Sequence, residues 1–253
     1  MFFLLTLGSA LGLALGNVLE AFGLRGSNSA KSLLKNKFWL GGLALSVVAT
    51  LLYYAAMAKY NISLVQPFMS LNPALTAILG WKLLGEKMTK RIAIAIAFIF
   101  CGLLIDGTQA GESAGSPHSL ETLWIYCGAV LALLAICCVF FLKHKRIEIA
   151  DALGAGVGFG LSAVLYKSIS IDGLFPPPVD FRLFSFAILY CAAFACSQVG
   201  LRRGRALFVI PLSAAAGLLV PAIGGILVFG DPAPVEKIVA LIFVALGSAL
   251  FVR

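Results

Sequence analysis

Residues 64–105 read LVQPFMSLNPALTAILGWKLLGEKMTKRIAIAIAFIFCGLLI, which is two apolar runs joined by a short basic turn. A bilayer core about 30 Å thick is crossed by about 20 helical residues, and each run has about that length. The rest of the chain has the same character. Of its 253 residues, 61% are hydrophobic and 12% are charged, whereas about a quarter are charged in soluble domains. The sequence therefore predicts an all-α integral membrane protein.

Nine apolar stretches, separated by charged or Gly/Pro/Ser-rich breaks, predict nine transmembrane helices. They cover residues 2–24, 38–58, 62–84, 91–107, 121–142, 150–170, 181–200, 206–229 and 235–252. Nine spans with short connections use almost the whole chain, so residues 1–253 are expected to form a single transmembrane domain. The first stretch lacks the positive n-region of a signal peptide, and it is therefore expected to remain as a helix.

The cations gather on one side of the predicted bundle. Of the 19 Lys and Arg residues, four lie on the side reached after even-numbered helices and the other fifteen lie on the opposite side. By the positive-inside rule, the N-terminus is outside and the C-terminus is cytoplasmic, in an inner or plasma membrane. The short basic loops suit anionic lipid headgroups, and they lack the basic domain that nucleic-acid binding requires. The expected partners are the lipid bilayer and no nucleic acid.

The chain also repeats itself at an offset of 144 residues. This offset aligns Gly12 and Gly16 with Gly156 and Gly160, aligns Val65-x-Pro67 with Val209-x-Pro211 and, after a one-residue gap, aligns Gly102 with Gly247. Helices one to four thus match helices six to nine, five crossings later, so the two halves should be inverted. We expect repeat one at residues 1–107, a linking helix at 121–142 and repeat two at 150–253, an arrangement found in many secondary transporters.

Glycines and prolines within the repeats predict where helices pack closely and where they kink. Glycines four residues apart on one helix face let helix backbones approach closely, which assigns helix packing to Gly12, Gly16, Gly156 and Gly160. Prolines inside apolar runs remove backbone donors, which predicts helix kinks at Pro67, Pro73, Pro211 and Pro221. Carbonyls freed at membrane depth are tolerated only against protein or a wet cavity. Helices three and eight are therefore candidates for lining a cavity, with a purely structural kink as the alternative.

Polar residues within the spans are the candidates for a substrate or ion pathway, because each is costly in hydrocarbon. They are Asn17, Glu20, Gln66, Ser70, Asn72, Tyr166 and Gln198. Hydrogen bonding between helices is the alternative role for each of them. Glu20 lies about 10 Å from the middle of the first helix, and a carboxylate there needs a partner or a wet cavity. Glu20 is also the candidate metal ligand.

Catalytic signatures are missing from the sequence. It contains no His-x-x-x-His pair, no Walker motif and no Cys-x-x-Cys pair. We therefore expect no enzyme activity, no catalytic residues and no cofactor.

The stretch at residues 64–105 resembles the repeat of the EamA-like drug/metabolite transporter superfamily. The shared features are an apolar helix entered through a proline, the ending Leu84-Gly85-Glu86, a short polar turn and a helix that carries Gly102. The second half resembles the repeat more weakly, since VFGDPAP stands at its turn. Nine helices, an outside N-terminus and a lone fifth helix are most similar to the NIPA-type branch, which is associated with magnesium transport. The resemblance implies a secondary transporter that works by alternating access on magnesium or another divalent cation.

Two other functions remain open at this stage. One is a proton-coupled exporter of a small organic metabolite or drug, in which Glu20 titrates while aromatic and aliphatic side chains line the substrate cavity. The other is a scaffold subunit of the membrane that transports nothing. A small-molecule or ion substrate distinguishes the two transport functions, the cation transporter and the metabolite exporter, from the scaffold. The sequence also leaves a homodimer open.

The charge distribution gives a testable topology. A peptide tag placed before Met1 should bind antibody on intact cells, whereas a tag placed after Arg253 should bind antibody only after permeabilisation. Reversed labelling would invert the orientation, and labelling of both tags from the same side would contradict an odd number of spans.

Overall fold

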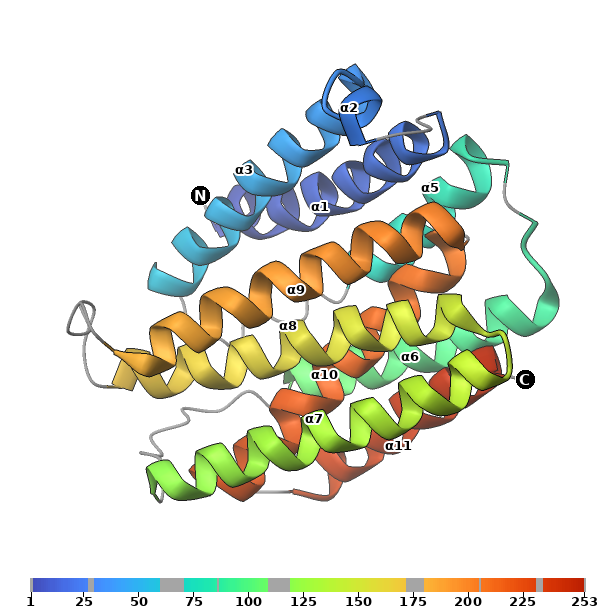
Figure 1. Cartoon of the computed structure of the whole chain (residues 1–253). Coiled ribbons are helices and arrows are strands. Elements are labelled where there is room, and N and C mark those ends of the chain that lie inside the picture. The colour runs from blue at the N-terminus through green and yellow to red at the C-terminus, as the bar shows by residue number, and fades with distance from the viewer. Residues whose placement is uncertain are drawn as a thin grey trace. The chain divides into compact units, whose positions relative to one another are not determined.

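The computed structural model describes residues 2–26, 30–59, 71–85, 87–108, 119–171, 180–204, 206–230 and 234–252. Within these ranges every regular element is an α-helix (Figure 1). The helices are α1 (Phe2–Arg25), α2 (Ala30–Leu33), α3 (Lys37–Lys59), α5 (Leu71–Leu83), α6 (Lys90–Thr108), α7 (Leu120–Lys143), α8 (Ile147–Ile171), α9 (Phe181–Arg203), α10 (Ala206–Phe229) and α11 (Val235–Val252).

Each of the nine apolar stretches contains a helix, and most helix ends agree with the sequence prediction to within three residues. The largest difference is α5, which begins at Leu71, with residues 60–70 outside the described part of the chain. Five helices in the described ranges, α1, α7, α8, α9 and α10, are long and apolar enough to cross a membrane. The prediction of an all-helical membrane protein is confirmed, while the count of nine spans and the inverted order stay predictions.

The chain forms two compact units that do not coincide with the two predicted repeats. Unit one comprises Met1–Glu112, Leu201–Pro211 and Val235–Arg253, and unit two comprises Ser113–Gly200 and Leu212–Pro234. Helix α11, which belongs to the second predicted repeat, is thus part of unit one. Helix α10 contributes to both units, and the division falls at Pro211.

In unit one, α6 and α11 contact each other through a reciprocal pair of glycines. A Cβ atom on Gly102 would lie 2.6 Å from Val244 and 2.7 Å from the Ala240 carbonyl oxygen. A Cβ atom on Gly247 would lie 2.7 Å from Ile99 and 2.8 Å from the Ala95 carbonyl oxygen. Each glycine thus faces the residues three and seven positions before the other glycine. Contacts at higher residue numbers of α11 involve lower residue numbers of α6, so the two helices are antiparallel. This is the relation expected between equivalent helices of inverted repeats.

Unit two has a buried core shared by α7, α8 and α10. Its members are Leu123, Tyr126, Cys127, Leu161, Val164, Leu165, Val220, Val228 and Phe229. The Tyr126 hydroxyl donates to the Val220 carbonyl oxygen, and the Tyr126 ring lies where a side chain on Gly224 would be. The Lys167 ammonium lies 4.3 Å from the centre of the Phe229 ring, which is within cation–π range.

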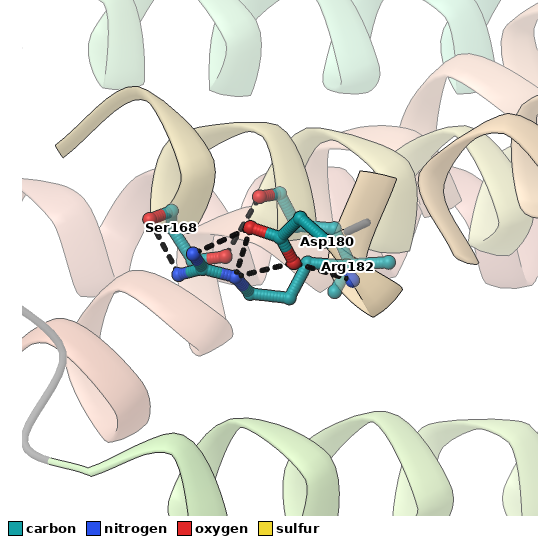
Figure 2. Close-up of polar contacts among 4 residues, drawn as sticks. Ser168, Asp180 and Arg182 are labelled. Atoms are coloured by element: carbon teal, nitrogen blue, oxygen red, sulfur yellow. Dashed lines mark hydrogen bonds and ion pairs between the residues drawn. The ribbon is translucent and has the colours of Figure 1, made fainter. Parts of the chain in front are cut away.

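An ion pair at the start of α9 is hydrogen-bonded to the end of α8 (Figure 2). The Asp180 carboxylate accepts the Arg182 backbone N–H at 2.8 Å and thereby caps α9. The same carboxylate accepts Nη2 of Arg182 at 2.7 Å, and Nη1 of Arg182 donates to the Ser168 carbonyl oxygen at 3.1 Å. The Arg182 hydrogen bonds hold the pKa of the Asp180 carboxyl below its usual range. The two side chains are only 13% and 8% exposed, so the pair acts as a fixed connection between the helices.

Replacing Asp180 with Ala should lower the free energy of unfolding in detergent by about 0.5–2 kcal/mol, the usual cost of losing a helix cap. Because the pKa of Asp180 is lower in the folded protein, its contribution should be complete above the unfolded pKa of about 4. The contribution should then disappear as the pH falls through the folded pKa. A pH series of unfolding curves for wild type and Asp180→Ala measures this. A difference in the free energy of unfolding between wild type and Asp180→Ala that stays the same at acid pH would contradict this expectation. The control is Glu121→Ala, which removes an acid from the first turn of α7.

Candidate functional site

Helices α1 and α3 pack closely through small residues. A Cβ atom on Gly12 would lie 2.9 Å from the Cβ atom of Ala49. A Cβ atom on Gly16 would overlap the Ser46 hydroxyl and would lie 3.0 Å from the Gly42 carbonyl oxygen. The two backbones therefore touch at Gly16 and Gly42, which is the close approach that small residues permit between membrane helices.

Glu20 lies inside this contact. Its side chain is 2% exposed, and Oε1 accepts a hydrogen bond from the Ser46 hydroxyl of α3 at 2.8 Å. Gly42 leaves the space that Glu20 occupies, because a Cβ atom there would lie 2.7 Å from the Glu20 nitrogen and 2.9 Å from its Cγ atom. The carboxylate thus lies between two helices with a hydrogen-bond donor across the interface, as a buried acid requires.

Asn36 fixes the nearby end of the same helix pair. Its Oδ1 atom accepts the backbone N–H groups of Phe38 at 3.0 Å and Trp39 at 3.2 Å, which caps α3. Its Nδ2 atom donates to the Gly23 carbonyl oxygen of α1 at 3.1 Å. Gly23 is three residues beyond Glu20, so this link holds the two helices together within one turn of the carboxylate.

Helix α5 belongs to the same unit as Glu20 and contacts α1. The Asn72 Oδ1 atom accepts the hydroxyl of the buried Thr76 at 3.1 Å. Pro73 lies in the first turn of α5, where the missing N–H would have no helical partner. Residues 60–70, directly before this turn, lie outside the described part of the chain, so the kink at Pro73 stays a prediction. Gln66, Pro67 and Ser70 lie outside the described residues.

The remaining predicted pathway residues are dispersed. Asn17 is half-buried on α1, three residues before Glu20, and Gln198 is half-buried on α9. Tyr166 is 44% exposed on α8, and its ring centre lies 6.0 Å from that of Phe186. Pro211 and Pro221 both lie within α10. Tyr166 and Gln198 belong to unit two and Glu20 to unit one, and their shared pathway stays a prediction.

The glycines that the 144-residue offset aligns contact different helices. Gly12 and Gly16 of α1 face α3, whereas Gly156 and Gly160 of α8 face α10, at Ser213, Ala216, Val220 and Pro221. The α8 glycines that face α9 are Gly154, next to Cys196, and Gly158, next to Ala193. All four aligned glycines make close helix contacts, but the residue-level alignment of α1 with α8 needs a shift of two residues.

Two residues of the site, Gly42 and Ser46, were not among the sequence candidates. They lie four residues apart on α3, which is the spacing of Gly12 and Gly16 on α1. Small residues at that spacing on two consecutive apolar stretches are a signal that could have identified them. The identity of the hydrogen-bond partner, however, depends on how the two helices align along their length.

The donor set around Glu20 is small. Across the described residues, no group of three or more His, Cys, Asp and Glu side chains could hold a metal ion. Glu20 and Ser46 offer a carboxylate and a hydroxyl. Magnesium commonly takes one or two protein carboxylates and keeps several of its waters, so the chemistry of these two groups is compatible with magnesium.

Comparison with known proteins identifies a family that matches part of the chain. Residues 1–106 match the EamA-like transporter family. The chain is 24% identical over 220 residues to the "Probable magnesium transporter NIPA9" of Arabidopsis thaliana, a match that covers 79% of this chain and 63% of that protein. No solved structure matches the chain. The resemblance seen in the sequence is thus confirmed, and the chain is an integral membrane protein that spans about three fifths of the length of this relative.

Neighbouring glycines of α3 test the contact around Glu20. Gly42→Ala should destabilise the protein by about 1–3 kcal/mol, the range for an added methyl group in a tightly packed position, because its Cβ atom would meet α1 backbone. Gly41→Ala is the matched control, since nothing lies within 4 Å of its Cβ position. Thermal unfolding in detergent measures both variants. Equal melting temperatures for the two would contradict the close packing of α1 on α3.

Proposed function

Because residues 1–106 carry an EamA-like transporter domain, we propose that this chain is a secondary transporter that works by alternating access and moves magnesium or another divalent cation. The observation that carries the proposal is the Glu20 carboxylate, buried between α1 and α3 and hydrogen-bonded to Ser46. Both residues lie within the matched domain.

The position of Glu20 supports an ion pathway. A charged side chain at the centre of a membrane helix costs about 2.5–3.5 kcal/mol on insertion scales, and such residues usually mark ion or substrate routes. Glu20 lies about 10 Å from the middle of α1, which places it inside the apolar region and within a few residues of the basic end at Arg25. A hydrated cation entering from that end meets the carboxylate after a short path.

Two features support alternating access. The reciprocal Gly102 and Gly247 contact is what inverted repeats would produce, and such repeats expose a central site to each side in turn. Pro211 and Pro221 leave the carbonyls four residues before them, at Leu207 and Gly217, without helical donors. Helix α10 therefore has weakened turns at two points, where a change of bend costs little hydrogen bonding.

Magnesium enters the proposal from two sources. The name of the Arabidopsis relative assigns magnesium to that protein, and the Glu20 and Ser46 donors suit a hard cation that keeps part of its water shell. Transport of magnesium by this chain, the direction of movement and any partner remain part of the proposal.

One observation favours a second candidate, a proton-coupled exporter of an organic substrate. Aromatic rings form a row across α8 and α9, with centres 5.2 Å apart for Phe159 and Tyr190, 5.9 Å for Phe186 and Tyr190, and 6.0 Å for Tyr166 and Phe186. Such a row could hold a flat or cationic organic molecule. A scaffold without transport has no comparable feature in its favour.

Replacing Glu20 with Gln tests the proposal directly. This change keeps the shape of the side chain but removes its charge. In proteoliposomes loaded with a magnesium-sensitive dye, flux should fall by about tenfold or more, because losing even a hydrogen-bond partner of a metal ligand costs about 10–100-fold. Expression and melting temperature should stay close to wild type.

Glu121→Gln, which neutralises an exposed acid in the first turn of α7, is the control and should transport normally. Unchanged magnesium flux in Glu20→Gln would remove Glu20 from the pathway. If the wild-type protein moves organic substrates in a proton gradient but does not move magnesium, the result would favour the exporter.

A further inference from the structure

Two helix pairs of this chain make the same set of close contacts. In unit one, Gly12 meets Ala49, and Gly16 meets both Ser46 and Gly42. In unit two, Gly154 meets Cys196, and Gly158 meets both Ala193 and Leu189. Adding 142 to the α1 positions and 147 to the α3 positions converts these three contacts into those of the second pair. The looser contact of Gly12 with Leu45, at 3.8 Å, has no counterpart at Gly154. The two pairs therefore share the same register at these three contacts.

This equivalence identifies what stands at the position of Glu20 in the other pair. The shift of 142 leads to Ser162 on α8, which is 3% exposed. The Ser162 hydroxyl donates to the Phe159 carbonyl oxygen of its own helix at 2.7 Å. The shift of 147 leads from Ser46 to Ala193, which is buried and has no hydroxyl. At these two equivalent positions the α8–α9 pair thus has a serine in place of the carboxylate and an alanine in place of the serine that donates across the interface.

The residue opposite the carboxylate changes as well. Gly42, which gives Glu20 its space on α3, corresponds to Leu189 on α9, which packs against the buried core of unit two. At the three equivalent positions, serine thus replaces the glutamate, alanine replaces the serine and leucine replaces the glycine.

We infer that the ion is recognised at Glu20 of the α1–α3 pair, with Ser46 as the positioning residue for Glu20, and that the equivalent position of the α8–α9 pair, at Ser162, does not bind it. The inference rests on the proposed transport function. Its physical basis is the direction of the hydrogen bonds. Ser162 satisfies its hydroxyl within one helix, whereas Ser46 donates to the neighbouring helix and so sets the orientation of the Glu20 oxygens, as outer partners of metal ligands do.

The test uses Ser46→Ala, Ser46→Thr and Ser162→Ala in the full chain, with magnesium flux into proteoliposomes measured over a range of magnesium concentrations. Ser46→Ala should raise the KM for magnesium by about tenfold, with a melting temperature close to wild type. Ser46→Thr retains the hydroxyl and should recover most of the affinity. Ser162→Ala removes an equally buried hydroxyl from the equivalent position and should leave the KM unchanged.

The outcomes separate the inference from the function on which it rests. If wild type transports magnesium but Ser46→Ala keeps the wild-type KM, or Ser162→Ala raises the KM as much as Ser46→Ala does, the inference is wrong and the proposed function stands. If wild type moves no magnesium, the proposed function is wrong and the assignment of these residues to an ion falls with it. If Ser46→Ala does not fold, Ser46→Cys, which keeps the size but weakens the donor, gives the same comparison.

Discussion

The bilayer core offers no water to polar groups, so every such group must find its partner within the protein. An α-helix pairs its backbone groups internally. The described polar side chains form hydrogen bonds either within their own helix or to a neighbouring helix. Ser162 and Ser168 donate to carbonyls of their own helix, whereas Ser46 donates to Glu20 of another helix. Among the described residues, no buried side-chain nitrogen or oxygen lacks a partner. In that setting a carboxylate held by a neighbouring helix distinguishes the α1–α3 interface from the other contacts.

Close approach of backbones makes such a bond possible. Lipid tails are as apolar as leucine, so membrane helices associate through packing instead of through exclusion of water. Gly16 and Gly42 bring α1 and α3 near enough for a short serine side chain to reach a glutamate on the other helix. Gly102 and Gly247 do the same for α6 and α11 without polar groups. Close glycine packing thus accommodates a buried hydrogen bond in one helix pair and a purely apolar contact in another.

Helix positions could be predicted from the sequence because a run of about 20 apolar residues has few alternatives to a membrane span. The burial of Glu20 also followed from its place within such a run. Its partner Ser46 did not, because one residue of helix turns a side chain by about 100°, and sequence alone does not fix that rotation between two helices. The glycine alignment shows the same limit. The contacts with α3 and α9 match Gly12 to Gly154, whereas the 144-residue offset matches it to Gly156, and two residues turn the compared helix face by about 200°.

The antiparallel contact of α6 with α11 also explains why α7 is needed, although it matches no helix of the predicted repeats. Successive membrane helices alternate in direction, so helices separated by an even number of crossings run the same way. Four helices followed directly by a second copy of the same four would enter the membrane in identical orientation, and their last helices would be parallel. One additional crossing reverses the second copy. If the predicted inverted repeat holds, α7 would allow a single polypeptide to hold two like-built halves in opposite orientations, an assembly that two separate chains could reach only by inserting in both directions.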